Sequence, residues 1–416
     1  MSNNDKKFSM LPIFLVVLID MIGIGIAIPV VASLFLSTDL LFGPSISFAT
    51  RTIILGFLIA SYPLAQFFGA PILGALSDNY GRKKILIISL IGTFIGYILF
   101  GIGIITQNLS LLFISRIIDG FTGGNITIAM ASIADISSKE EKVKRFGIIG
   151  MSFGFGMIIG PVIGGILANN NIVSWFNYAT PFFFAATLCA INIALFILMF
   201  NETLTRRRKT DISLYTGIKN LKRALNLNHQ SLKTVFLFAF LFTLGFSFYT
   251  QFSQIFLIEK FSITTTQIGI YFGYLGICIV LTQGIIVRKL AKHFKPENIL
   301  PFSALGISLS IILILLPKNM LGIYIITAMI AICAGLTMPN LNALVSNLTP
   351  KDEQGEIIGI NQSIQSLAMA IPPIIAGFFA AIYYKLPVII GSAFIFLAWI
   401  IFITLFKKAH KETQEK

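Results

Sequence analysis

Long apolar runs recur along the whole sequence and limit what the chain can fold into. A helix that crosses the hydrocarbon core of a bilayer needs about 20 apolar residues, and runs of that length follow one another through all 416 residues. Hydrophobic residues make up 56% of the chain and charged residues only 12%, whereas about a quarter of a soluble domain is charged. We therefore expect lipid to surround most of this chain.

Six apolar runs precede a polar stretch and six follow it, which predicts twelve spanning helices. The runs are Met10–Leu36, Ile53–Leu76, Ile85–Ile105, Leu109–Ala134, Phe146–Ala168, Tyr178–Phe200, Thr234–Ile258, Gln267–Leu290, Ile299–Leu316, Met320–Val345, Ile357–Ala381 and Pro387–Phe406. The first run is too long for a cleavable signal peptide and is expected to span the membrane. The expected fold is an all-α membrane protein with helical bundles at residues 1–200 and 234–416, joined by a cytoplasmic linker at residues 201–233.

Lysine and arginine gather in alternate connections between the runs. Examples are Arg82–Lys84, Lys139–Arg145 and Arg288–Lys295, whereas the intervening connections hold few basic residues. Loops that stay in the cytoplasm carry an excess of Lys and Arg. The net charge of +14 is therefore a topology signal rather than a nucleic-acid surface. With an even number of spans, both termini are expected in the cytoplasm.

The two halves of the sequence look related. Leu76–Leu86 aligns with Leu290–Leu300, each after the second span of its half, and Gly120–Asn125 aligns with Gly335–Asn340. A duplicated six-helix unit predicts two pseudo-symmetric bundles. In such an architecture the substrate site lies near the middle of the membrane between the halves.

A short basic loop between the second and third spans contains two glycines and a possible ion pair. Gly74 permits close helix approach and Gly81 permits a tight turn, while Asp78 can pair with Arg82 or face the positive end of a helix. A plain basic turn is the alternative interpretation. The full string from Gly74 to Leu86, however, resembles the signature loop of the major facilitator superfamily. That resemblance implies the major facilitator fold, a secondary transporter, and a cytoplasmic gate at these four residues.

Several glycines and one proline fall on the predicted fifth span. They are Gly147, Gly156, Gly160, Pro161, Gly164 and Gly165. In lipid, small residues let helix backbones touch, so close packing alone is one explanation. The spacing is similar to the antiporter motif of the drug/proton antiporter branch of the superfamily, which implies export.

An acidic residue lies inside the first span. Asp20 is about 15 Å along the helix from Met10, at about 1.5 Å of rise per residue, and an ionised carboxylate there costs about 2.5 to 3.5 kcal/mol. It must face a polar cavity, hold a proton, find a cation, or merely position helices. The segment resembles the first helix of bacterial tetracycline efflux proteins, in which the matching acid belongs to the transport pathway.

The fourth span carries a second charged group. Arg116 and Asp119 lie three residues apart and share a helix face, so they can neutralise one another. Alternatively, protonation of Asp119 releases Arg116 to another partner. Arg116 and Gly120 resemble the superfamily's fourth-helix motif, whose Arg is linked to proton coupling, whereas Asp119 is not part of that motif. Asp135 is expected to be a helix-end charge.

Three departures separate this chain from the tetracycline proteins. Gly96 stands where they carry an acid in the third helix, Ile279 where they carry a His in the eighth, and no acid lies near Gly306 in the ninth. The polar side chains of the second half are amides and hydroxyls, which either bridge helices or suit a neutral or zwitterionic ligand. Candidate substrate contacts are Asn125, Tyr249, Gln251, Asn340, Asn361 and Gln365.

These expectations combine into a proton-coupled exporter of a drug-like molecule or metabolite that works by alternating access. It is expected in a bacterial inner membrane as a monomer, with the proton gradient in place of a cofactor, and with no metal, nucleic acid or enzymatic activity. A siderophore exporter, a nutrient importer and a membrane sensor that does not transport are the alternatives. The three cysteines and three histidines have no metal-site spacing.

Overall fold

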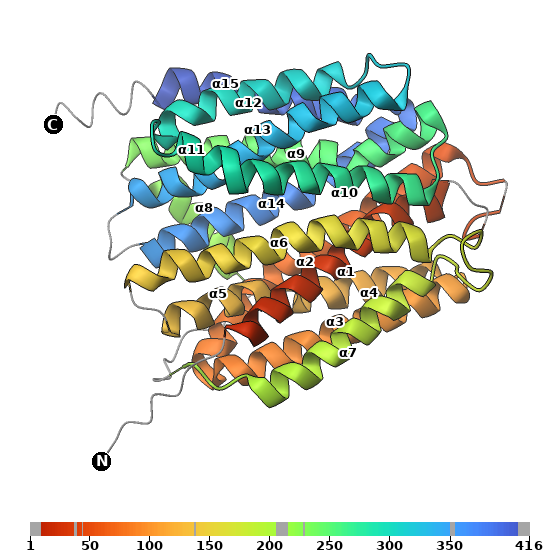
Figure 1. Cartoon of the computed structure of the whole chain (residues 1–416), viewed down its shortest axis with the longest axis horizontal. Helices are drawn as coiled ribbons and strands as arrows, with labels where there is room; N and C mark the ends of the chain where they lie inside the picture. Colours follow the sequence, from red (N-terminus) through yellow and green to blue (C-terminus); the bar gives the residue numbers. More distant parts are fainter. Residues whose placement is uncertain are drawn as a thin grey trace.

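The structure is a computed structural model that describes residues 10–36, 40–43, 45–136, 139–204, 215–227, 229–349 and 354–406. Figure 1 shows long helices running side by side as a single bundle. The helices are α1 (Leu11–Leu36), α2 (Phe48–Tyr80), α3 (Arg82–Ile105), α4 (Leu109–Thr122), α5 (Asn125–Ile136), α6 (Lys139–Leu167), α7 (Thr180–Met199), α8 (Thr216–Asn226), α9 (Gln230–Phe261), α10 (Thr265–Leu281), α11 (Arg288–Leu290), α12 (Pro296–Leu313), α13 (Met320–Asn347), α14 (Gln354–Ile382) and α15 (Leu386–Ile401). Two π-helical turns are also present. The first, η1 (Thr282–Val287), joins α10 to α11, and the second, η2 (Phe402–Phe406), extends α15.

Ten helical segments in the described part of the chain are long and apolar enough to cross a membrane. The pair α4 and α5, together with α6, completes the twelve predicted spans. The fourth span is not one continuous helix, as its apolar run had predicted, because Gly123 and Gly124 interrupt it. The eighth span includes the η1 turn, which the periodicity of the sequence does not reveal.

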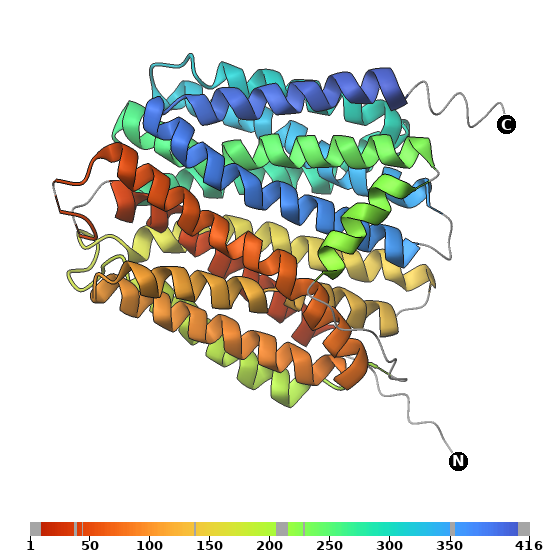
Figure 2. The same ribbon diagram turned by 180° about the vertical axis from the view of Figure 1, so that it is seen from behind.

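The predicted linker contains the helix α8, and residues 205–214, like both chain ends, lie outside the described residues. Where α8 joins the bundle, Gly217 lies against the ring of Phe67 on α2. Asn220 Nδ2 donates a hydrogen bond of 3.0 Å to Ser363 Oγ on α14. Figure 2 shows this short green helix crossing α14 on the rear face of the bundle. The α8 helix therefore contacts both halves of the protein.

Matching helix contacts in the two halves reflect the internal duplication. In the first half α3 packs against α4 and α7, and in the second half α12 packs against α13 and α15. The principal contacts between the halves are α2 with α14 and α6 with α10. The helices α2 and α10 are the second spans of their halves, and α6 and α14 are the fifth spans. Each contact therefore joins the second span of one half to the fifth span of the other, as expected for two pseudo-symmetric six-helix bundles.

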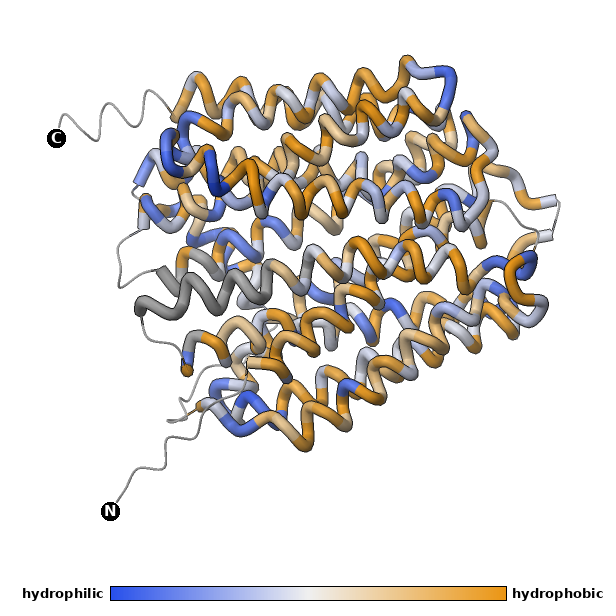
Figure 3. The backbone as a smooth tube through the Cα atoms, viewed as in Figure 1, coloured by the Kyte–Doolittle hydropathy of each residue, from blue (hydrophilic) through white to orange (hydrophobic). Residues whose placement is uncertain are grey.

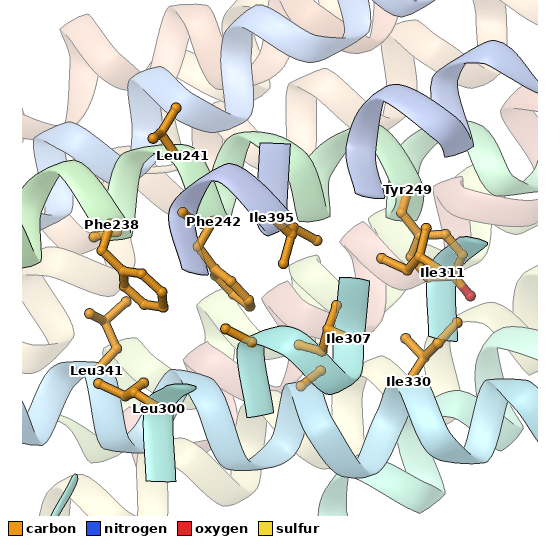
Figure 4. Close-up of a cluster of buried hydrophobic side chains, with 14 of the residues drawn as sticks. Phe238, Leu241, Phe242, Tyr249, Leu300, Ile307, Ile311, Ile330, Leu341 and Ile395 are labelled. Atoms are coloured by element: carbon orange, nitrogen blue, oxygen red, sulfur yellow. The ribbon is translucent and has the colours of Figure 1, made fainter. Parts of the chain in front are cut away.

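Hydrophobic side chains fill the interior of the bundle and cover its sides. Figure 3 shows apolar residues along the middle of the helices and hydrophilic residues gathered at the two ends. In the second half, Phe238 and Phe242 of α9 meet Leu300 and Ile307 of α12, together with Ile395 of α15, in a fully buried cluster (Figure 4). Burial of such side chains from water and lipid fixes the relative positions of the helices.

The two halves pack tightly at one end of the bundle and separate toward the other. We call the end that carries the Tyr80–Arg82 turn the basic end and the opposite end the far end. Near the far end, a side chain at Gly56 of α2 would collide with the carbonyl of Pro373 on α14 and press against the backbone of Gly377. Gly74 lies 18 residues after Gly56 on α2, and Gly359 lies 18 residues before Gly377 on α14. Because 18 residues make five turns at about 3.6 residues per turn, each pair of glycines lies on one face of its helix. A side chain at Gly74 or Gly359 would meet nothing within 4 Å, so α2 and α14 diverge toward the basic end.

Candidate functional site

Asp20 is buried in the middle of α1, inside the first half. Its exposed fraction is 6%. The amide of Asn125, the first residue of α5, lies beside the Asp20 carboxylate, and Asp119 of α4 is within electrostatic range. A side chain at Gly23 would collide with the hydroxyl of Tyr97, so α1 approaches α3 closely at this level. The predicted intramembrane acid therefore faces polar groups from α3, α4 and α5 rather than lipid.

Arg116 and Asp119 form the ion pair that their spacing predicts. Arg116 Nη2 lies 3.4 Å from Asp119 Oδ2, and the exposed fractions of the two residues are 8% and 3%. The guanidinium carbon lies 4.6 Å from the ring centroid of Phe100 and 6.0 Å from that of Tyr62. Among the described residues, Arg116 Nε has no hydrogen-bond partner, and Nη2 has none beyond its ion pair with Asp119. The cation is therefore held by one carboxylate and two aromatic faces, and it retains free donors.

Two tyrosines complete this buried group, which we call the acid cluster: Asp20, Tyr62, Tyr97, Arg116 and Asp119. The ring of Tyr62 lies 6.0 Å from the Arg116 guanidinium carbon, and the hydroxyl of Tyr97 lies against Gly23, three residues from Asp20 on α1. The two acids and the arginine were predicted from the sequence, whereas the tyrosines were not. Each is a polar side chain inside an apolar run, which is the signal that would have identified it.

The break between α4 and α5 brings Asn125 into place beside this cluster. Gln66 Nε2 on α2 donates a hydrogen bond of 2.8 Å to the carbonyl of Gly123, which satisfies a backbone acceptor released where the helix stops. A side chain at Gly124 would lie 2.8 Å from the Cα of Ala70 on α2. Only small residues fit between these helices, and the interruption places the N-terminus of α5 near the middle of the span.

Arg82 is the centre of a second cluster, at the basic end. Its Nη1 lies 2.7 Å from Asp78 Oδ1 and 2.6 Å from Ser77 Oγ, and its Nε lies 3.0 Å from Asp135 Oδ2. The exposed fraction of Arg82 is 7%. One guanidinium therefore joins the ends of α2, α3 and α5. Asp135 lies at the end of α5, as predicted, and is also a partner of Arg82.

Glu202 completes this cluster, and the sequence analysis did not identify it. Its carboxylate accepts hydrogen bonds from the backbone N–H groups of Arg82, at 2.9 Å, and Lys83, at 3.1 Å, so it caps the N-terminus of α3. Gly81 has φ +106°, and a side chain there would meet the Glu202 carboxylate. The members of this cluster come from the first half and, with Glu202, from the start of the linker, so in this conformation it does not join the halves.

The glycines of α6 make close helix contacts. Side chains at Gly156, Gly160 and Gly164 would collide with the backbone of α1, and one at Gly165 with the backbone of α10. Pro161 also lies in these contacts, against Gly25 on one side and Gly269 on the other. Gly147 lies on α6, but its surroundings fall outside the described side chains. The glycine face thus holds α6 between α1 of its own half and α10 of the other.

Tyr249, a candidate substrate contact, lies in the core of the second half. Its side chain has an exposed fraction of 0%, and its hydroxyl lies 2.6 Å from that of Tyr271. The Tyr271 hydroxyl in turn accepts a hydrogen bond of 3.1 Å from Thr327. Figure 4 shows Tyr249 beside Ile311 and Ile330. This network joins α9, α10 and α13, and in this conformation it stabilises the packing of those helices.

The other candidate amides have varied surroundings. Gln251 Nε2 donates to Ser247 on its own helix and to the Met369 carbonyl on α14, while Asn340 Nδ2 donates to the Leu336 carbonyl on its own helix. Asn361 is buried and its Nδ2 lies 3.4 Å from Asn342 Oδ1. Gln365 is half-buried on α14, and Asn125 is the one candidate that lies at the acid cluster. No group of three or more His, Cys, Asp or Glu side chains in the described part of the chain is arranged to hold a metal ion.

The fold and the two charged clusters define a multi-pass membrane transporter. The chain matches the family model of the Major Facilitator Superfamily over residues 13–373 and again over residues 235–416. This protein belongs to the major facilitator superfamily.

Its relatives in sequence include bacterial resistance proteins. The chain is 30% identical over 392 residues to the class C tetracycline resistance protein of Escherichia coli, with 94% of this chain and 92% of the relative covered. It is 26% identical to multidrug resistance protein 2 of Bacillus subtilis, covering 90% of each chain, and 27% identical to the quinolone resistance protein NorA of Staphylococcus aureus, covering 94% of each.

Solved structures share the fold at lower identity. The human organic anion transporter MFSD10 superposes with a TM-score of 0.72 at 19% identity, covering 94% of this chain and 98% of that one. A D-xylose-proton symporter superposes with a TM-score of 0.74 at 14% identity, covering 95% and 97%. These matches establish the architecture.

Proposed function

We propose that this protein exports a small drug-like molecule in exchange for protons, by alternating access, across a bacterial inner membrane. The names of its relatives, which include tetracycline, quinolone and multidrug resistance proteins, favour export over the import of a nutrient. The amides and hydroxyls of the second half favour a neutral or zwitterionic substrate.

The acid cluster is the observation that carries this proposal. Two buried carboxylates, Asp20 and Asp119, are placed around a single buried guanidinium, that of Arg116. If both carboxylates were ionised, the cluster would hold one uncompensated negative charge inside apolar spans, at a cost of about 2.5 to 3.5 kcal/mol. Binding one proton removes that charge. Asp119 already has Arg116 as its partner, so Asp20 is the group that carries the proton.

The second carboxylate gives the cluster two arrangements. When Asp20 is protonated, Arg116 pairs with Asp119, as in this structure. When Asp20 releases its proton, both carboxylates compete for Arg116, whose Nε and Nη2 have no other hydrogen-bond partner among the described residues. Proton release can shift the conformation only if the protonated and ionised forms of Asp20 interact differently with the rest of the protein. The competition of the two carboxylates for Arg116 is such a difference.

The basic end is the cytoplasmic side under this proposal, because cytoplasmic loops carry the excess of Lys and Arg. Both termini are then cytoplasmic. The diverging faces of α2 and α14 at that end make this the inward-facing conformation, closed at the far end. Asp78 and Arg82 lie beside the region that must close in the outward-facing conformation, which supports their role at the cytoplasmic gate.

The membrane potential and the pH gradient drive the exchange. Each proton that enters down a potential of 100 mV supplies about 2.3 kcal/mol, enough for roughly a fiftyfold substrate gradient. One titrating carboxylate is sufficient for this coupling. We therefore propose that the protein needs no bound cofactor and works as a monomer.

Transport in proteoliposomes tests the proposal. With an imposed pH gradient, the wild-type protein should accumulate a tetracycline or a quinolone, and Asp20→Asn should abolish accumulation while leaving the thermal unfolding temperature close to the wild-type value. Glu297→Gln, which removes an acid near the start of α12 at the basic end, is the matched control and should transport normally. Normal proton-driven accumulation by Asp20→Asn would refute the assignment of Asp20.

A further inference from the structure

A cavity at the far end lies between the two halves, away from the acid cluster. Its volume is about 790 Å³, within the range of about 300 to 1,000 Å³ typical of small-molecule sites. One wall is formed by residues 168–171 and 176–178, between α6 and α7, and the other by residues 258–259 and 262–266, where α9 ends and α10 begins. The chain therefore has a concave site at the far end, formed jointly by its two halves.

Hydrogen bonds across the boundary between the halves hold this cavity together. Asn169 Nδ2 of the first half donates to Thr266 Oγ1 of the second at 3.0 Å, and Thr266 Oγ1 donates to the carbonyl of Gly165 at 2.9 Å. The walls can keep their present spacing only while the far end is closed. A ligand that contacts both walls would stabilise this conformation.

Glu259 gives the cavity a negative charge. It is the one charged residue among the described residues that line the cavity, and it forms no ion pair with another described residue. The neighbouring Lys260 forms no ion pair with it, and the Lys260 ammonium instead donates a hydrogen bond of 2.7 Å to the carbonyl of Leu315. A concave surface with an unpaired carboxylate attracts a cation.

Aromatic and amide groups make this surface suited to an organic cation. Phe176 and Tyr178 line the same cavity as Glu259, and an ammonium group near an aromatic face gains about 0.5 to 2 kcal/mol. Asn170 and Asn171 add amides that can bond a polar substituent of the ligand. An inorganic cation would gain little from the aromatic wall.

We propose that this far-end cavity binds an organic ammonium cation, with Glu259 as its counter-ion and Phe176 and Tyr178 as its aromatic wall. The ligand joins the two halves and stabilises the conformation in which the far end is closed. The site is separate from the acid cluster, and binding to it can be measured on purified protein without any transport.

Trp175 provides a reporter for this site. Its ring packs edge-on against Phe176, with ring centroids 4.6 Å apart, and the chain has only two tryptophans. In purified protein carrying Trp399→Phe, the remaining fluorescence comes from Trp175. The probe is choline, and the control ligand is dimethylbutanol, its uncharged carbon isostere. Glu259→Gln removes the counter-ion, Glu259→Asp keeps it, and Glu297→Gln makes the same chemical change at the basic end.

The expected result is a saturable change in Trp175 fluorescence with choline. The midpoint should rise at least about tenfold in Glu259→Gln, should stay within about threefold in Glu259→Asp, and should not change in Glu297→Gln. Choline should also raise the unfolding temperature of the wild type more than that of Glu259→Gln. Absence of a saturable response in the wild type, an equal response to dimethylbutanol, or an unchanged midpoint in Glu259→Gln would each overturn the proposal.

Discussion

The Cβ of Asp119 occupies the space beside Gly96 that a side chain at position 96 would fill. A Cβ built on Gly96 would lie 2.8 Å from the Cβ of Asp119 and 3.3 Å from the carbonyl oxygen of Ser115, both closer than normal van der Waals contact. The third span of the tetracycline proteins that this sequence resembles carries an acid in place of Gly96. In this protein α4 supplies a carboxylate to the same level of the bundle, and the glycine on α3 makes room for it.

Substituting Gly96 should therefore disturb the acid cluster. Gly96→Ala is expected to displace Asp119 from Arg116, because the helix backbones on both sides leave no room for a methyl group, and overpacking of this kind costs about 1 to 3 kcal/mol. Proton-driven accumulation in proteoliposomes should fall at least about fivefold, the factor that corresponds to about 1 kcal/mol. Gly284→Ala is the control, because a side chain there would meet nothing within 4 Å. Equal transport by the two variants would contradict this prediction.

The ion pair within the acid cluster predicts non-additive effects on stability. In an Asp20→Asn background, where Asp20 cannot replace Asp119 as the counter-ion, Asp119→Asn leaves the Arg116 cation buried and unpaired, and Arg116→Gln does the same to the Asp119 carboxylate. Each of these changes should destabilise the protein by about 3 kcal/mol. The double variant has neither unpaired charge. Its loss of unfolding free energy should be smaller than the sum of the two single losses by about 0.5 to 3 kcal/mol. Chemical unfolding of the four purified proteins measures this coupling. Additive losses would show that the pair does not contribute to stability.

The capping of α3 by Glu202 predicts a stability effect at the basic end. Glu202→Gln removes a negative charge from the helix N-terminus and should cost about 0.5 to 2 kcal/mol. Gly81→Ala should cost at least as much, because its φ of +106° is strained for a residue with a side chain and the added Cβ would meet the Glu202 carboxylate. The unfolding temperature of each variant is the measurement. An unfolding temperature for Glu202→Gln equal to that of Glu297→Gln would contradict the capping role.

The sequence predicted the apolar spans and the loop at Arg82 well, because length, hydropathy and basic residues are local properties. The break at Gly123 could not be read from hydropathy, since the helices on both sides of it are equally apolar. Glu202 was missed for another reason. Its backbone partners at Arg82 and Lys83 are about 120 residues away in the chain, and only the packing of α7 beside α3 brings them together.

The amide candidates illustrate the same limit. Asn125 and Asn340 occupy matching positions in the aligned repeats, yet Asn125 lies beside Asp20 and Asn340 bonds the carbonyl of Leu336 on its own helix. A polar side chain inside a span signals that it needs a partner. Which partner it finds depends on helix rotation, which the sequence pattern alone does not determine.

The position of α8 predicts a role in keeping α2 and α14 apart. Cysteines introduced by Gly74→Cys and Gly359→Cys, in a protein whose native cysteines are replaced, should form a disulfide slowly, because these two helix faces diverge. Asn220→Ala removes the hydrogen bond to Ser363 and should speed cross-linking by about twofold to tenfold, since a hydrogen bond contributes about 0.5 to 1.5 kcal/mol. Asn226→Ala, on the exposed side of the same helix, is the control. Equal rates in the two variants would rule out this role for α8.

The most direct measurement of the central claim is the number of protons released when the purified protein binds its drug. The ligand is chosen by a thermal-shift screen of tetracyclines and quinolones, since a ligand that binds the folded state stabilises it, and proton release is followed with a pH-sensitive dye in weakly buffered solution near neutral pH. If Asp20 carries the exchanged proton, binding should release protons from the wild type and from Glu297→Gln but almost none from Asp20→Asn. Release from Asp20→Asn equal to that of the wild type would contradict the account.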